Sequence, residues 1–241
     1  MRRVPGEARS ATATLSDGER VRAPAYPAES GAQTPLDPAT FALFRWLSAR
    51  RGRRIFHPRA AAYAARFTAT PLGLDAVIFA DGFEHEALVR VSRGLGVRPP
   101  LPDVFGLALR LPDVYGAGRH QDFLLASSGN GAIGRHLLRW TRGARTGTYS
   151  SLLPYDVGAA RLLVGARPAP ASTSAFELLV APATGEWRIA ARLTLETQLD
   201  PSVARALRFD PWHSGGGLVP AGLVNRVRGA AYRGSQSGSV A

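Results

Sequence analysis

The chain has 241 residues, of which 45% are hydrophobic, and it contains no cysteine. This composition fits an ordinary globular protein, and it excludes disulfides, cysteine-ligated zinc, iron–sulfur clusters and thiolate-ligated haem. The formal net charge is +12, and every basic residue is an arginine because the sequence has no lysine. Such a charge raises nucleic-acid binding as an alternative. The arginines are scattered apart from one cluster within residues 50–54, so we do not expect a nucleic-acid partner.

The first 59 residues predict an arm and a helix. Residues 1–35 are rich in Pro, Gly, Ala, Ser and Thr, which is typical of an extended or disordered arm. Asp37 is a good N-cap and Pro38 a good first helical residue, so a helix is expected over residues 41–50. No apolar run of about 18 residues and no signal-peptide core are present. We therefore expect a cytoplasmic protein without a membrane partner.

From residue 60 onward, apolar residues alternate with polar ones, which predicts short strands bounded by Gly, Pro and Asp. Helices are expected over residues 132–142 and 223–232. Because the strands follow one another without regular βαβ alternation, the expected fold class is α+β, an antiparallel β-barrel with flanking helices over residues 36–241. Residues 183–186 predict a hairpin turn between the last two strands. The predicted strands are 63–70, 87–93, 106–111, 122–127, 174–181 and 187–195.

A glycine-rich segment, Gly129-Asn130-Gly131-Ala132-Ile133-Gly134, has the GxGxxG spacing of a dinucleotide-binding turn, with Asp156 about 20 residues further on. That function also requires a parallel βαβ unit, which the following segment does not predict, so a structural turn is the better interpretation. His85-Glu86 resembles the start of a zinc-protease motif, but the second histidine is missing.

Three further segments, taken together, resemble the haem catalase family in order and spacing. The first is Arg54-Ile55-Phe56-His57-Pro58-Arg59-Ala60. The second is Leu88-Val89-Arg90-Val91-Ser92, followed by Asp103-Val104-Phe105-Gly106-Leu107-Ala108. The third is Leu207-Arg208-Phe209-Asp210-Pro211-Trp212, followed by Arg228-Gly229-Ala230-Ala231-Tyr232. The resemblance covers roughly residues 50–235 and is closest to the small catalase-related peroxidases.

The resemblance implies ferric haem b with Tyr232 as the axial ligand of the iron. Arg228, four residues earlier on one helix face, would stabilise the phenolate. His57 would be the catalytic acid and base on the distal side, with Ser92 holding its second ring nitrogen. Two arginines, Arg54 and Arg90, resemble the partners of the haem propionates, and Phe56 would keep the distal pocket dry.

The sequence departs from the family at three places. Residues 122–128 stand where catalases carry a distal asparagine, so the amide is absent and Asn130 is shifted along the chain. The third propionate arginine is replaced by Ser239, for which Arg233 could compensate. The helical carboxy-terminal domain and its NADPH site are not expected.

These departures predict a haem peroxidase with weak catalase activity. Its partners would be a small-molecule peroxide and an organic donor, and the family allows a homo-oligomer. Two alternatives stay open: a haem-binding or sensing protein without turnover, and a biosynthetic haem enzyme of the catalase-related type.

Overall fold

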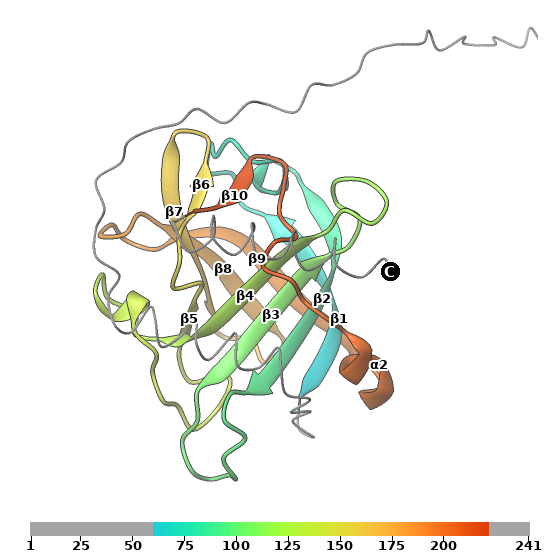
Figure 1. Cartoon of the computed structure of the whole chain (residues 1–241), viewed down its shortest axis with the longest axis vertical. Helices are drawn as coiled ribbons and strands as arrows, with labels where there is room; N and C mark the ends of the chain where they lie inside the picture. The colour runs from blue at the N-terminus through green and yellow to red at the C-terminus, as the bar shows by residue number, and fades with distance from the viewer. Residues whose placement is uncertain (1–59, 222–241) are drawn as a thin grey trace, which may run out of the picture. The chain divides into compact units, whose positions relative to one another are not determined.

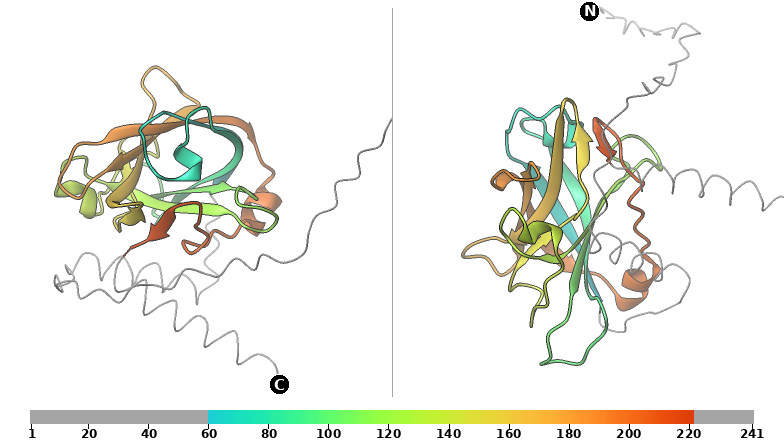
Figure 2. Two further views of the ribbon diagram at one scale, coloured as in Figure 1. Left: turned by 90° about the horizontal axis from the view of Figure 1, so that it is seen from above. Right: turned by 60° about the vertical axis from the view of Figure 1, so that its left-hand side comes forward.

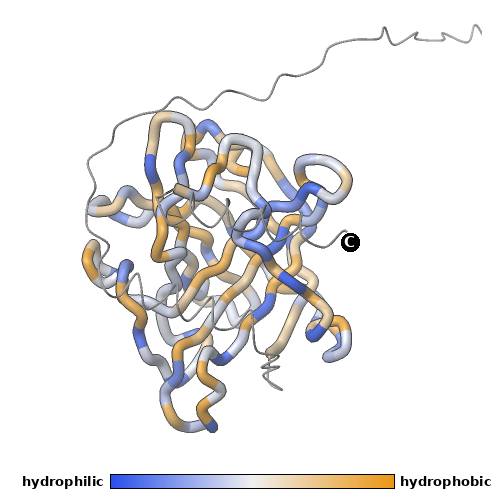
Figure 3. The backbone as a smooth tube through the Cα atoms, in the orientation of Figure 1, coloured by the Kyte–Doolittle hydropathy of each residue, from blue (hydrophilic) through white to orange (hydrophobic). Residues whose placement is uncertain are grey.

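The computed structural model describes residues 60–221, in which the alternating pattern of the sequence forms strands. In β1 (Ala61–Ala69) the side chains of Ala65 and Phe67 are buried. In β2 (Glu84–Arg93) the side chains of Ala87 and Val89 are buried. Because successive side chains of a strand point to opposite faces, the residues between them face outward. Figure 3 shows this alternation as hydrophobic and hydrophilic segments along the strands.

Eight antiparallel strands close into a barrel, in the order β1-β2-β3-β4-β5-β7-β8-β9 and back to β1. The strands β6 and β10 extend the sheet beside β7 (Figure 1). In the view from above in Figure 2, the strands surround a common interior. The remaining elements are β3 (Phe105–Leu111), β4 (Gln121–Ser128), β5 (Thr148–Ser150), β6 (Tyr155–Val157), β7 (Ala160–Pro168), β8 (Ala175–Ala181), β9 (Arg188–Gln198), β10 (Leu218–Pro220), the 3₁₀ turns η1 (Val77–Phe79) and η2 (Gly134–His136), and helix α2 (Pro201–Ala206).

The interior of the barrel is filled with apolar side chains contributed by every long strand. Closed barrels of eight strands have an interior just wide enough for side chains to fill, so the core leaves the outward face as the surface on which a large ligand can lie. The core includes Phe67, Val89, Leu107, Leu109, Phe123, Leu125, Tyr149, Val164, Phe176, Leu178 and Leu193.

The predicted antiparallel barrel is confirmed, and all six predicted strands are present with small shifts of their ends. Four strands were not predicted: β5, β6, β7 and β10. The short helix α2 was also not predicted; Asp200 caps it by accepting a hydrogen bond from Ser202 N at 2.7 Å. The predicted arm and the helices at 41–50 and 223–232 lie outside the described residues. Within residues 60–221, no helix is long and apolar enough to cross a membrane.

The predicted helix over residues 132–142 is wrong, because the glycines before it form a tight loop. This region contains only η2. A Cβ atom on Gly129 would lie 2.8 Å from the Cα atom of Gly134, so the loop depends on the close approach of two glycines. The guanidinium of Arg135 lies over the ring of Trp187 at 4.5 Å and fastens the loop to the barrel. The GxGxxG pattern is therefore a structural turn between antiparallel strands.

Candidate functional site

Two predicted site residues, Arg90 and Ser92, lie two positions apart on β2 and therefore point to the same outward face of the barrel. Pairing across β1 to β4 continues this face in two rows of mostly small side chains. A surface of alanine and glycine lets a flat ligand come close to the strands. The rows are Ala62, Arg90, Ala108 and Leu124, and Ser92, Gly106 and Ala126.

The second row places Ser92 beside positions that carry almost no side chain. A Cβ atom on Gly106 would lie 3.3 Å from Ser92 Oγ, so the glycine leaves room for the serine. Among residues 60–221 no hydrogen bond to Ser92 Oγ is formed, which leaves the hydroxyl available. The position on β4 in this row is Ala126, which packs with Leu138 and Leu152. This row therefore presents a methyl group and no amide on β4.

The side chain of Arg90 is half-buried, and its guanidinium has no anion partner among the described residues. Its Nε atom is buried and has no hydrogen-bond partner. Burial lowers the pKa of Arg90, and the positive charge of the nearby Arg208 lowers it further. Because arginine stays protonated in proteins, the Nε–H group of Arg90 is a buried donor without an acceptor among residues 60–221. The residues present therefore fit the carboxylate of a ligand.

A buried carboxylate ties the chain after α2 to the outward face. Asp122 on β4 is fully buried and accepts hydrogen bonds from Arg110 Nε at 2.7 Å and Arg110 Nη2 at 2.6 Å. It also accepts from the backbone N of Asp210 at 2.7 Å, and His213 Nδ1 lies 3.1 Å from its Oδ2 atom. This hydrogen bonding raises the pKa of Arg110. We call these four residues the Asp122 latch.

The latch brings two of the three family-like segments together in space. The Nη2 group of Arg110 donates to the backbone oxygen of Arg208 at 2.6 Å, and the ring of Phe209 lies under the same guanidinium at 5.3 Å. Figures 1 and 2 show the chain after α2 running along the outer side of β3 and β4. As a result Arg208, from the third segment, lies near Arg90, from the second.

Five predicted site residues cannot be placed, because they lie outside residues 60–221: Arg54, Phe56, His57, Arg228 and Tyr232. Asn130 is described, and it does not lie with Ser92. Its backbone oxygen accepts from Trp187 Nε1 at 3.1 Å and its side chain lies near Thr148, beside β5 and the β8–β9 hairpin. Asn130 therefore does not supply the missing amide.

Three of the described tyrosines are unsuited to bind iron as phenolates. Burial raises the pKa of Tyr115, Tyr149 and Tyr155 well above that of a free phenol. Tyr115 donates to Gln121 Oε1 at 3.0 Å, and Tyr149 to the backbone oxygen of Ala144 at 2.5 Å. These side chains belong to the protonated core of the barrel.

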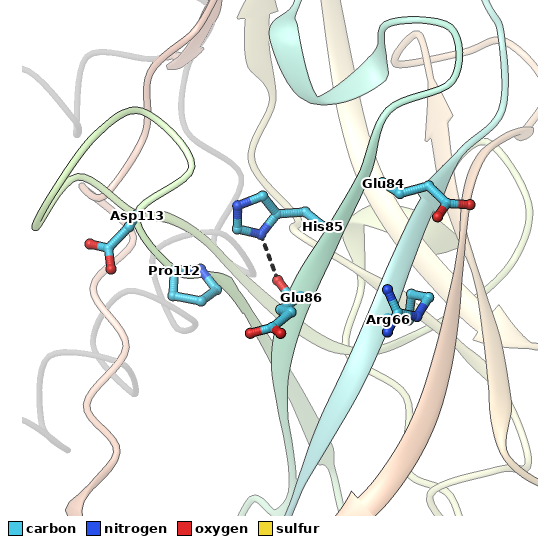
Figure 4. A pocket seen from close by; sticks show the side chains of 6 residues that line it. All are labelled: Arg66, Glu84, His85, Glu86, Pro112 and Asp113. Carbon is cyan, nitrogen blue, oxygen red and sulfur yellow. Dashed lines mark hydrogen bonds between the residues drawn. The ribbon is translucent and has the colours of Figure 1, made fainter. Parts of the chain in front are cut away.

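An open hollow of about 470 Å³ lies farther along the outward face of β1 and β2 from Arg90, at the end of the barrel where β2 begins. Figure 4 shows that Glu84, His85 and Asp113 contribute to its walls, with His85 Nδ1 donating to the backbone oxygen of Glu86 at 2.8 Å. In residues 60–221 no cluster of three or more His, Asp or Glu side chains could hold a metal ion.

Sequence reasoning missed His213 and the role of Arg208. In the sequence, the segment 207–212 stands out only as part of the family pattern, and His213, which follows it, belongs to no motif. The signal that could have found them is the pair Asp122 and Arg110, two charged residues at directly opposed outward positions of neighbouring strands. Opposite charges at such positions indicate an ion pair and mark the place where another segment can bind.

Comparison with known proteins supports the fold. No protein-family model matches the sequence, and no curated protein does. A crystal structure of a fungal catalase is similar to the chain, with a TM-score of 0.53 and 12% sequence identity. The match covers 89% of this chain and 66% of that chain, so the chain spans just under two thirds of the catalase. The protein therefore has the fold of the catalase core.

Proposed function

We propose that the protein is a haem-dependent peroxidase of the small catalase-related type. The observation that carries the proposal is the buried Nε atom of Arg90, which lacks an acceptor among residues 60–221. In a catalase fold this arrangement suits a haem propionate, since carboxylates bind arginine through charge-assisted hydrogen bonds. The neighbouring alanines and glycine suit the flat face of a porphyrin.

The chain's own residues would divide the work between two sides of the haem. Haem, when bound, would pass electrons from an organic donor to the peroxide. Tyr232 would bind the iron as a phenolate stabilised by Arg228, and Arg54 would join Arg90 on the propionates. His57 would take a proton from the peroxide and return it to the leaving oxygen. Ser92 would hold the ring of His57, and Phe56 would exclude water.

The row of Ser92, Gly106 and Ala126 supports a peroxidase over a catalase. A distal amide helps to position a second peroxide for oxidation, and the β4 position of this row carries only a methyl group. Proton transfer by His57 does not need that amide. We therefore propose that an organic donor, and not a second peroxide, supplies the electrons. We propose that the reaction takes place in the cytoplasm.

The first test is the visible spectrum and the turnover of the purified chain. We expect uptake of hemin with a Soret band, rapid oxidation of an organic donor by peroxide, and little oxygen release. His57→Ala should keep the haem and slow donor oxidation by roughly 10²–10⁴-fold, the usual contribution of a general acid–base residue.

Each alternative gives a different result in the same experiment. A protein that takes up no hemin would contradict the proposal outright. Uptake without turnover, unchanged in His57→Ala, would identify a haem-binding or sensing protein. Conversion of an organic hydroperoxide into a rearranged product, without donor oxidation, would identify the biosynthetic type.

A second prediction concerns Arg90 itself. Arg90→Met should lower hemin affinity by about 10–100-fold, since a hydrogen bond to a charged group contributes about 1.5–3 kcal/mol. The unfolding free energy of the haem-free protein should be unchanged or higher, because the variant removes a half-buried charge whose Nε atom has no acceptor among residues 60–221. Hemin titration and urea unfolding measure the two effects.

The matched control is Arg66→Met, an outward arginine on β1 that is half-exposed and paired with Glu196 at 3.3 Å. It should leave hemin affinity unchanged. If Arg90→Met bound hemin as tightly as the unmodified chain, Arg90 would not hold a propionate.

A further inference from the structure

Two loops at the end of the barrel next to Ser92 and Ala126 present an apolar surface to solvent. Residues 94–104 join β2 to β3 and residues 129–147 join β4 to β5, and they meet where the backbones of Asp103 and Thr141 exchange hydrogen bonds of 2.8 and 2.9 Å. Five of the nine exposed large apolar side chains of residues 60–221 lie on these loops. They are Leu95, Leu101, Ile133, Leu137 and Trp140, with exposures of 48%, 58%, 79%, 39% and 55%. Ile133 and Leu137 flank η2, whose Arg135 and His136 contact the β8–β9 hairpin, so they lie apart from the junction of the two loops. We call the other three side chains, Leu95, Leu101 and Trp140, with the arginines named below, the loop-end surface.

The fold holds the first of these loops in place. The fully buried carboxylate of Asp103 accepts hydrogen bonds from the backbone N of Leu95 at 2.9 Å and of Val97 at 3.0 Å. Arg93 Nη2 donates to the backbone oxygen of Leu101 at 2.7 Å. The exposure of the two leucines therefore follows from a defined loop conformation.

Arginines surround these apolar side chains without acids to neutralise them. Arg98, Arg139 and Arg142 are exposed, and among residues 60–221 their side chains form no ion pair or hydrogen bond. The two loops contain one acidic residue, Asp103, which is buried and already hydrogen-bonded. The surface is therefore apolar and positively charged at the same time.

We propose that the loop-end surface binds the surface of an anionic lipid bilayer. Leucine side chains enter the boundary between headgroups and acyl chains, where tryptophan is also favoured, and nearby arginines attract lipid phosphates. A membrane partner is not expected from the sequence, because these side chains come from two separate loops and belong to no apolar run. The proposal does not depend on haem, since it concerns only the described loops.

A second copy of the chain and a nucleic acid fit the loop-end surface less well. A second copy of the chain would bring two strongly positive surfaces together, because the net charge is +12. Nucleic acid would be attracted by the arginines and could stack on Trp140. It would gain nothing from the exposed aliphatic side chains, since its binding relies on phosphate contacts and stacking on aromatic rings.

The test is sedimentation of the full chain with vesicles of phosphatidylcholine, alone or mixed with phosphatidylserine. We expect binding to the mixed vesicles, weak binding to phosphatidylcholine alone, and loss of binding at high salt. The tryptophan emission should shift to shorter wavelength on binding, and the shift should be lost in Trp140→Phe, which keeps an apolar ring.

Two sets of variants separate the apolar from the charged contribution. Leu101→Ser with Trp140→Ser should weaken binding at least about tenfold. Changing Arg98, Arg139 and Arg142 to Gln should weaken it by about fivefold per residue, because each arginine near an anionic surface contributes about this much. The matched controls are Val203→Ser with Val219→Ser, and Arg188, Arg192 and Arg205 changed to Gln, which alter equally exposed residues elsewhere.

Three results would overturn the proposal. The first is no binding to phosphatidylserine vesicles. The second is that changing the control arginines weakens vesicle binding as much as changing the loop arginines does. Binding would then depend on net charge alone. The third is that an oligonucleotide displaces the vesicles, and that its own binding is lost when Trp140 or the three loop arginines are changed. This result would assign the surface to nucleic acid.

Discussion

Replacing Tyr232 by Phe is expected to abolish stable haem binding if the proposed function is correct. Phenylalanine has no oxygen to bind iron, and a free phenol ionises only near pH ~10, so the wild-type ligand needs the positive charge of Arg228. The buried tyrosines of the barrel cannot replace it, because burial raises the pKa of Tyr149 and Tyr155. Removing a residue that hydrogen-bonds to a metal ligand lowers metal affinity by roughly 10–100-fold. Removing the ligand itself should lower hemin affinity by more than this.

Hemin titration followed by the Soret band measures this effect. The matched control is Tyr63→Phe, on β1, whose hydroxyl forms no hydrogen bond with residues 60–221 and which should leave hemin affinity unchanged. Arg228→Ala should keep the haem but shift the spectrum with pH near neutrality, since the phenolate loses its cation. An unaltered spectrum in Tyr232→Phe would show that the iron is bound by another residue.

The barrel could be predicted from the sequence because most of its strands have one buried and one outward face. The strand β7 could not be predicted, because it has consecutive buried residues and no outward face in its middle. Leu162, Leu163 and Val164 are all buried, so no alternation marks them as a strand. A short continuous apolar run of this kind cannot be distinguished from a buried helix by periodicity alone.

The helix expected over residues 132–142 shows how local pattern can mislead. Apolar residues in this stretch have helical spacing, but several of them are exposed: Ile133, Leu137 and Trp140. The glycines at 129 and 134 form a turn that no helix can accommodate. Of these side chains, Trp140 belongs to the loop-end surface, next to the hydrogen-bonded pair Asp103 and Thr141.

Only part of the candidate site was accessible to sequence reasoning. Arg90 and Ser92 could be assigned to one face, because two residues on one strand share a face. The approach of Arg208 to Arg90 could not, because it depends on the path of the chain after α2 across the barrel. That path is set by hydrogen bonds between residues far apart in sequence, such as Asp122 and Asp210.

Breaking the Asp122 latch should cause the largest loss of stability among single polar substitutions on the outward face. Asp122→Asn removes the buried negative charge that pairs with Arg110, whose side chain is only 14% exposed. Breaking a buried ion pair by removing one partner costs about 3–5 kcal/mol, because the other charge is left uncompensated. Urea unfolding of the haem-free chain measures this loss.

The matched control is Asp156→Asn, which breaks a pair of the same kind at the surface. Asp156 lies 2.7 Å from Arg161, but the two side chains are 41% and 64% exposed. Such exposed pairs contribute about 0–1 kcal/mol, so this variant should unfold almost like the unmodified chain. Equal losses in the two variants would mean that burial does not decide the strength of the latch. Hydrogen exchange gives an independent readout, because the amide of Asp210 donates to Asp122 and should exchange faster only in Asp122→Asn.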